Sequence, residues 1–360
     1  MIPKDISEVT PQWMSEVLEQ SVNTLEYTQI GQGVGIMGDI YRVTIDTNSD
    51  SVFPSVVVKL PSSAEENRAQ GIALGMFEAE VRFYKELAGR VQVGLPQVYA
   101  AEIVAGTADF VIVMEDLSEL TLVDQAAGMT AEQAMTAVEV LAHVHATWWD
   151  QARDPSLEWI PSMVGERISF VDQMLTDVLP VFLEGFGKAL PPGGPELYER
   201  FAGNYLKVNQ TLAARSPWTI VHQDFRVENL LFGPAGSGRM VILDWQGIGR
   251  GPGSYDLGYL LSGSMEPALR RTHEDNLLAR YLDTLIDLGI ENYSMQQLRD
   301  DYALSQLQGG LATSMFIGGG MDLSNARGKQ LATTMASRHV TAALDHDGLS
   351  LINQIANRPD

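Results

Sequence analysis

The stretch that most constrains this chain is residues 221–246, which read VHQDFRVENLLFGPAGSGRMVILDWQ. Two short apolar runs, LLF and MVIL, stand on either side of a Gly/Pro/Ser turn, and this pattern predicts a β-hairpin. A hairpin needs only a Gly or an Asn at its turn. Here His222, Asp224 and Asn229 precede the first run, and Asp244 follows the second. These polar residues therefore indicate either turn chemistry or phosphate chemistry.

The spacing His222-x-Asp224-x-x-x-x-Asn229 matches the catalytic loop of kinases. In that chemistry Asp224 orients an attacking hydroxyl and accepts its proton. Asn229 offers an uncharged oxygen to Mg²⁺, and Asp244, after the second strand, offers a carboxylate; both are hard oxygen ligands. The alternative is a turn Asp, a turn Asn and a strand-end Asp, each of them common. The joint pattern favours Asp224 as the catalytic residue and Asn229 with Asp244 as metal ligands.

A glycine-rich segment lies near the N-terminus, where IGQGVGIMGDIYRV contains Gly33-x-Gly35-x-x-Gly38. In a dinucleotide-binding fold this motif opens a helix. Here YRVTID follows and alternates, which predicts a strand, and Lys59 ends the next strand. The pattern therefore disfavours a Rossmann-type dehydrogenase. A strand, a glycine loop, two strands and a lysine form the kinase arrangement, in which glycines let backbone N–H groups approach phosphate.

Lys59 ends the run SVVVK and is suited to hold the α- and β-phosphates of a nucleotide. It needs a carboxylate to position it, and the predicted helix FEAEVRFY offers both Glu78 and Glu80. The alternative is an exposed lysine and an exposed helix, since Lys and Glu are common on surfaces.

The pattern along the chain changes class near residue 117. Residues 1–116 alternate as strands, with a helix predicted over 75–90, and the apolar run in DFVIVMEDL suits a central strand. Residues 117–360 are mainly helical apart from 218–246. With 360 residues in all, we expect an α+β protein with two lobes. The helices predicted beyond residue 117 cover 130–149, 166–187, 195–215 and parts of 264–357.

The composition excludes several partners. A net charge of -22 repels nucleic acid and anionic membranes. The chain has no cysteine, so disulfides and thiolate metal sites are excluded. The N-terminus lacks the pattern of a signal peptide, and no apolar run reaches the roughly 18 residues of a membrane span. We therefore expect a cytoplasmic protein without a membrane or nucleic-acid partner, and its oligomeric state stays open.

These motifs resemble those of the aminoglycoside phosphotransferase and choline kinase superfamily. Within it the chain is most similar to the ecdysteroid kinase-like branch and its bacterial relatives. The stretches that carry the resemblance are EVRFYKEL, FVIVMEDL, LAHVHATWW, VHQDFRVENLLF and VILDWQGIGRGPGSYDLGYLL. The resemblance implies a bilobal protein-kinase-like fold: a nucleotide-binding lobe over residues 1–116, with an antiparallel sheet and a helix, and a mainly helical lobe over 117–360 that carries the catalytic loop and the substrate pocket.

The resemblance also implies roles for individual residues. The resemblance implies that Lys59 pairs with Glu80. It also implies that adenine binds to the backbone of Glu115 and Leu117, with Met114 at the back of the adenine pocket. Together with the glycines, these residues are the expected nucleotide site.

The same resemblance makes His222 and Asp256 structural braces of the catalytic segment. The chain departs from the family where it has Gln223, which is often Gly, and Glu228, which is often Asp. His143 and His145 lie two apart on a predicted helix, so they cannot chelate together, and we expect them to pack in the core.

We therefore predict a phosphotransferase that uses ATP and Mg²⁺ to phosphorylate a hydroxyl of a small molecule. Only GIGRGPGSY separates Gln246 from Asp256, which leaves no room for the activation loop of a protein kinase. A nucleotide-binding pseudokinase is the alternative, disfavoured by the intact Lys59, Asp224, Asn229 and Asp244. The acceptor stays open: the acidic charge suits a cationic alcohol, and the resemblance favours a sterol-like or polyketide alcohol.

Overall fold

The computed structural model describes residues 2–31, 38–47, 54–320 and 326–358. The chain forms two compact units. The first consists of residues 1–120 and 241–247, and the second of residues 121–240 and 248–360. The sequence placed the division after residue 116 and did not anticipate that 241–247, far along the chain, would belong to the first unit.

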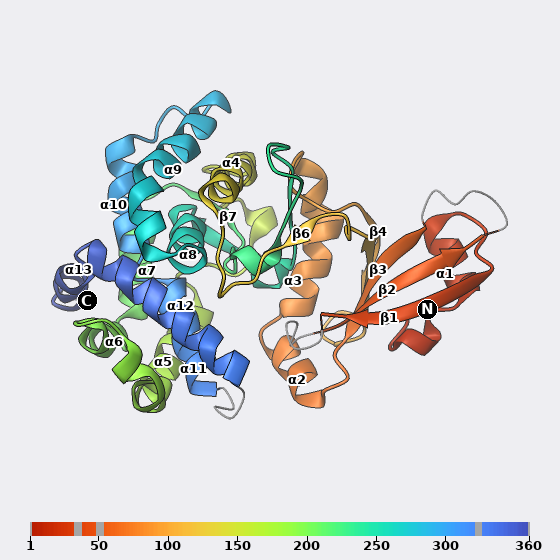
Figure 1. Cartoon of the computed structure of the whole chain (residues 1–360), viewed down its shortest axis with the longest axis horizontal. Coiled ribbons are helices and arrows are strands. Elements are labelled where there is room, and N and C mark those ends of the chain that lie inside the picture. Colours follow the sequence, from red (N-terminus) through yellow and green to blue (C-terminus); the bar gives the residue numbers. More distant parts are fainter. Residues whose placement is uncertain (1, 32–37, 48–53, 321–325, 359–360) are drawn as a thin grey trace. The chain divides into compact units, whose positions relative to one another are not determined.

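A five-stranded antiparallel sheet organises the first unit, with the order β1-β2-β3-β5-β4 (Figure 1). Strand β5 therefore has a neighbour on each side, as its apolar sequence predicted. The strands are β1 (Thr24–Ile30), β2 (Gly38–Asp46), β3 (Ser55–Pro61), β4 (Val98–Ile103) and β5 (Phe110–Glu115).

Both faces of this sheet are covered, which explains the unbroken apolar run of β5. Val111 and Val113 belong to one buried cluster with Met14 of helix α1 (Pro11–Leu18). On the alternate positions of the strand, the ring of Phe110 stacks on that of Phe77 in helix α3 (Met76–Arg82), with 4.9 Å between centroids. A strand buried on both faces needs apolar side chains at every position.

The helix predicted over residues 75–90 is divided in the structure. It consists of α3, a π-helical turn η2 (Phe83–Leu87) and a 3-10 turn η3 (Ala88–Arg90). A further helix, α2 (Glu65–Ala73), precedes it and was not predicted. Single π-turns inside helices are rare, and those that exist are often at functional sites. This one begins at Phe83, three residues after Glu80.

Helices build most of the second unit (Figure 1). One cluster of buried apolar side chains joins α5, α6, α7, α10, α11, α12 and α13. The helix predicted over 195–215 is two helices, because Gly203 adopts a left-handed φ of 81° between them. The helices are α4 (Ala131–Thr147), α5 (Glu166–Phe186), α6 (Gly194–Phe201), α7 (Tyr205–Ala213), α8 (Ser254–Ser264), α9 (Pro267–Asp287), α10 (Met295–Ser305), α11 (Gly309–Gly320), α12 (Ala326–Asp345) and α13 (Gly348–Ala356).

Short strands frame the segment with the kinase-like spacing. Strand β7 (Trp218–Val221) pairs with β10 (Gly249–Pro252), and β6 (Thr121–Leu122) pairs with β8 (Leu230–Phe232). A 3-10 turn, η6 (Val227–Asn229), lies just before β8.

The predicted hairpin turn is present after β8. It is closed by a hydrogen bond of 2.9 Å from the Gly233 N–H to the Arg239 carbonyl. Strand β9 (Met240–Ile242) and the 3-10 turn η7 (Trp245–Gly247) follow. Within the part of the chain that the structure describes, no helix is long and apolar enough to cross a membrane.

Candidate active site

Lys59 of β3 forms a buried ion pair in the first unit. Its Nζ lies 2.8 Å from Glu80 Oε2 and 3.1 Å from Asp244 Oδ1. The side chains of Lys59 and Glu80 are 8% and 1% exposed. Of the two acids that the sequence offered, Glu80 is thus the one that contacts the lysine.

Electrostatics keep Lys59 charged. Burial by itself would lower its pKa, but the charges of Asp244 and Glu80 outweigh this effect and raise the pKa above its ordinary value. Burial raises the pKa of the Glu80 carboxyl, and the Lys59 ammonium opposes that shift. One cation between two carboxylates gives a centre whose charges depend on each other.

Each residue of the Asp-Trp-Gln motif has a partner in this unit. Asp244, with a left-handed φ of 64°, contacts Lys59. The Trp245 ring stacks on Phe83 of the π-turn at 3.8 Å between centroids. The Gln246 side chain hydrogen-bonds Glu80. The motif therefore fixes both members of the ion pair, a function of Trp245 and Gln246 that the sequence analysis missed.

Of the three glycines in the predicted phosphate loop, Gly38 is described, while Gly33 and Gly35 lie outside the described residues. Gly38 opens β2, where a Cβ would stand 3.0 Å from the Leu60 carbonyl oxygen and 3.4 Å from Lys59 Cε. Glycine at this position therefore leaves room for the lysine side chain.

The residues expected around adenine lie at the end of β5. Met114 is buried. The Glu115 N–H donates to the Gln97 carbonyl at 2.9 Å, and Glu115 Oε1 accepts from the Gln97 N–H at 2.7 Å. Leu117 is buried, and its carbonyl accepts from the Leu120 N–H at 2.9 Å. Backbone hydrogen bonds thus fix the segment that the resemblance assigned to adenine.

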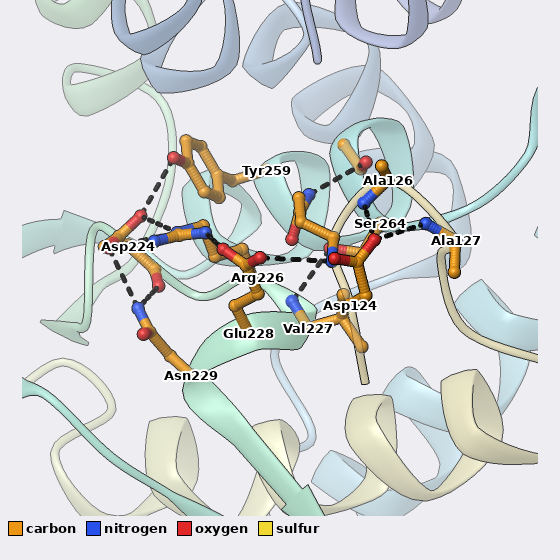
Figure 2. Close-up of polar contacts among 12 residues, drawn as sticks. Asp124, Ala126, Ala127, Asp224, Arg226, Val227, Glu228, Asn229, Tyr259 and Ser264 are labelled. Carbon is orange, nitrogen blue, oxygen red and sulfur yellow. Dashed lines mark hydrogen bonds and ion pairs between the residues drawn. The ribbon is translucent and has the colours of Figure 1, made fainter. Parts of the chain in front are cut away.

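In the second unit, a network of hydrogen bonds and ion pairs holds Asp224, which lies at one end of the contacts drawn in Figure 2. Its Oδ1 accepts from the Tyr259 hydroxyl at 2.9 Å, and its Oδ2 accepts from Asn229 Nδ2 at 2.9 Å. Arg226 Nε lies 3.2 Å from Oδ1. The Asp224 side chain is 35% exposed, so it is held in one orientation while a small molecule can still reach it.

The same contacts orient the amide of Asn229. Its Nδ2 donates both to the Asp224 carboxylate and, at 2.8 Å, to the Asp224 backbone carbonyl. Both are acceptors, so they require the amide NH₂ rather than its oxygen. Asn229 Oδ1 is consequently the atom of this amide suited to a cation.

Arg226 links Asp224 to Glu228 (Figure 2). Burial would lower the pKa of Arg226, but the charge of Asp224 leads a set of interactions, including Glu228, that raise it above its ordinary value. Glu228 also accepts from the Gln125 N–H at 3.3 Å. Glu228 thus holds the arginine beside Asp224; the sequence analysis recorded Glu228 only as a departure from the family and missed Arg226 and Tyr259.

Asp256 of α8 holds the backbone of the segment that precedes Asp224. It accepts from the backbone N–H of His222 at 2.7 Å and of Gln223 at 2.9 Å. His145 Nε2 lies 3.3 Å from the same carboxylate, so its helix packing includes a polar contact that spacing could not reveal. Gln223 has a left-handed φ of 67°, a backbone conformation that favours glycine.

The donor chemistry suits a hard divalent cation. Among the described residues, no group of three His, Cys, Asp or Glu side chains is placed to hold a metal by itself. Asn229 Oδ1 and the 40% exposed carboxylate of Asp244 are oxygen donors of the type Mg²⁺ prefers, and Mg²⁺ keeps waters and phosphate oxygens as its remaining ligands. Each of these two residues, taken by itself, therefore has the donor chemistry of a Mg²⁺ ligand.

A family model described as ecdysteroid kinase-like matches residues 32–291. The chain belongs to the ecdysteroid kinase-like family. An uncharacterised kinase-like protein from Caenorhabditis elegans is 22% identical to this family member over 328 residues, which cover 83% of this chain and 85% of that protein.

Two solved structures resemble the whole chain. Choline kinase from Cryptosporidium parvum is 10% identical, with a TM-score of 0.58, and the match covers 97% of this chain and 95% of that one. Amicoumacin kinase in complex with AMP-PNP, Ca²⁺ and its ligand is 13% identical, with a TM-score of 0.51, and the match covers 94% and 96%. These likenesses confirm the predicted α+β, protein-kinase-like fold. The family and these neighbours are kinase-like phosphotransferases.

Proposed function

We propose that this family member transfers the γ-phosphate of ATP to a hydroxyl of a small molecule in a Mg²⁺-dependent reaction. The observation that carries the proposal is the Asp224 carboxylate, which is fixed by Tyr259 and Asn229 yet remains partly exposed. A carboxylate in this state can accept a hydrogen bond from an incoming hydroxyl and orient its oxygen for attack.

The nucleotide is assigned to the first unit, which contains residues 1–120. Adenine presents one donor and one acceptor at its edge, which the Glu115 carbonyl and the Leu117 N–H would match, with Met114 behind the ring. The glycines Gly33, Gly35 and Gly38 would cover the phosphates. Lys59 would neutralise the α- and β-phosphates, held in place by Glu80.

The acceptor is assigned to residues 117–360. Asp224 binds the hydroxyl and takes its proton as the oxygen forms a bond to the γ-phosphorus and the bond from that phosphorus to the leaving ADP oxygen breaks. Arg226 balances the charge of Asp224 and keeps its carboxylate in place. Asn229 and Asp244 would hold Mg²⁺, which when bound neutralises charge on the phosphates. The amicoumacin kinase neighbour, with its nucleotide analogue and divalent cation, supports this assignment.

Two measurements test the proposal. Mg-ATP should raise the midpoint of thermal unfolding, because a ligand that binds the native state alone stabilises it. A library of small alcohols should contain at least one that stimulates ADP release. A raised midpoint without turnover of any alcohol would favour a pseudokinase. If millimolar Mg-ATP left the midpoint unchanged, nucleotide binding and hence the proposal would be refuted.

A further inference from the structure

Among the residues that the structure describes, Arg167 has no acidic partner, although it lies beside the segment that carries Asp224. It lies in the first turn of α5, and its side chain is largely shielded from water. A guanidinium has five N–H donors. Among the described residues, its one hydrogen-bond acceptor is Gln223 Oε1, at 2.7 Å from Nη2. Four of its N–H donors are therefore left for another group.

The surroundings of Arg167 provide no compensating carboxylate in the described part of the chain. The groups that act on its charge are the phenols of Tyr255 and Tyr205, and burial lowers its pKa without removing the charge at neutral pH. Glu166 is exposed, and Asp172 accepts from the backbone N–H of Tyr205 at 2.9 Å. A cation in the first turn also faces the positive end of the helix dipole.

Other shielded arginines of the same unit are satisfied by backbone carbonyls or by acids. Arg338 donates to the carbonyls of Gln125, Gly263 and Ala126. Arg226 pairs with Asp224 and Glu228. Arg270 pairs with Glu274 and Asp345. The chain has 46 acidic and 24 basic residues, so carboxylates are plentiful. The lack of an acid beside Arg167 in the described residues therefore has another cause. Arg167, with a single amide acceptor among the described residues, differs from these arginines and is suited to bind an anion.

Arg167 is connected to the reactive carboxylate within one unit. Gln223, its hydrogen-bond partner, immediately precedes Asp224 in the chain. From the other side, Tyr255 stacks parallel to Tyr259 at 6.4 Å between centroids, and Tyr259 donates to Asp224. One residue step plus one side-chain length places the guanidinium on the order of 10 Å from Asp224. A single small molecule can span that separation.

We propose that the acceptor is a hydroxylated carboxylic acid whose carboxylate binds Arg167 while its hydroxyl faces Asp224. This rests on the proposed kinase function and names the class of its substrate. A carboxylate matches the planar fork of a guanidinium and forms two parallel hydrogen bonds with it. Cationic alcohols bring a positive charge to the same position and are disfavoured there. Sulfate and phosphate esters of alcohols share the anionic chemistry and are separated from carboxylates by experiment.

The test compares ADP release with matched acceptors. The probes are short- to medium-chain hydroxy acids, their primary amides, the corresponding amino alcohols, and hydroxyalkyl sulfates and phosphates. For the wild type, kcat/KM should be higher for the acid than for its amide by on the order of 10- to 100-fold, the range for a charge-assisted hydrogen bond. Arg167→Gln should abolish this ratio by raising KM for the acid, and Arg167→Lys should restore part of it.

Arg299→Gln is the matched control, since Arg299 is half exposed and pairs with Asp275 at the surface of the same unit; its ratio should equal that of the wild type. Two results would overturn the inference and leave the kinase function standing. One is a higher kcat/KM for amino alcohols than for hydroxy acids, and the other is an equal loss of kcat/KM for acid and amide in Arg167→Gln. Preference for sulfates or phosphates over carboxylates would overturn the carboxylate assignment.

A binding measurement covers the case in which no probe is turned over. With Mg-ADP present, hydroxy acids should raise the unfolding midpoint of the wild type and not of Arg167→Gln, while their amides raise neither. If Mg-ATP raises the midpoint and no hydroxy acid does, the substrate class is wrong and nucleotide binding is retained. If Mg-ATP has no effect either, the proposed function itself fails.

Discussion

The two polar centres of this protein are built by different means. In the first unit, Lys59 lies between Glu80 and Asp244, and the charges themselves hold the centre together. In the second, Asp224 is held by a phenol and an amide beside a single arginine, and it keeps 35% of its side chain exposed. The first centre should thus be tied to folding stability, and the second to turnover.

The largest effect should come from removing the charge of the exposed carboxylate. Asp224→Asn should lower kcat by at least roughly 10²-fold, the lower end for a general base, because the amide cannot accept the proton. The rise in unfolding midpoint with Mg-ATP should persist. Asp275→Asn, at an acid 82% exposed in the same unit, is the control. Turnover of Asp224→Asn at the wild-type rate would show that the role is assigned wrongly.

Breaking the buried pair should mainly cost stability. Lys59→Met leaves the Glu80 carboxylate buried without its cation, and we expect a loss of about 3–5 kcal/mol in the free energy of unfolding. The double variant Lys59→Met/Glu80→Gln should recover much of that loss. Denaturant titration of both variants decides the point, and a double variant no more stable than the single one would contradict it.

The pH dependence of Lys59→Met follows from the same pair. Burial already raises the pKa of Glu80, and loss of the lysine removes the interaction that opposes this shift. An acid whose pKa is higher in the folded state destabilises the fold above its unfolded pKa of about 4.3 and not below it. The stability difference from the wild type should therefore shrink as pH falls toward about 4.

An intermediate effect is expected at the brace of the catalytic segment. Asp256→Asn places an NH₂ group against one of the two backbone N–H donors of His222 and Gln223. An unsatisfied buried donor costs about 1–3 kcal/mol. Both the free energy of unfolding and kcat should fall, unlike Asp224→Asn, where kcat falls alone. Unchanged kcat in a folded Asp256→Asn protein would show that the brace does not set the position of Asp224.

The smallest effect should follow removal of one hydroxyl. Tyr259→Phe deletes the hydrogen bond to Asp224 Oδ1 and should lower kcat by about tenfold or less, the equivalent of about 0.5–1.5 kcal/mol. Tyr27→Phe, whose hydroxyl donates to the Val9 carbonyl in the first unit, is the matched control and should leave kcat unchanged. A Tyr259→Phe loss as large as that of Asp224→Asn would mean that Tyr259 takes part in the chemistry.

The sequence was sufficient to predict features that depend on the spacing of residues along the chain. The strands β1 to β5, the hairpin turn, the α+β class and the kinase-like loop around Asp224 follow from periodicity, glycines and a fixed interval of residues. The sequence could not decide between Glu78 and Glu80 as the partner of Lys59, because both lie on the same predicted helix. Only the packing of that helix against the sheet decides which one is buried with Lys59.

The contacts that complete the two polar centres come from segments distant in sequence. Trp245 on Phe83, Tyr259 on Asp224 and Arg167 on Gln223 each join residues separated by dozens of positions. A sequence pattern records intervals along the chain, whereas burial and the pairing of charges depend on distances through space. The sequence by itself thus determined the class of fold and the spacing of the loop around Asp224. The tertiary structure decided which charges have acidic partners, and among the described residues it gives Arg167 a single amide acceptor, Gln223.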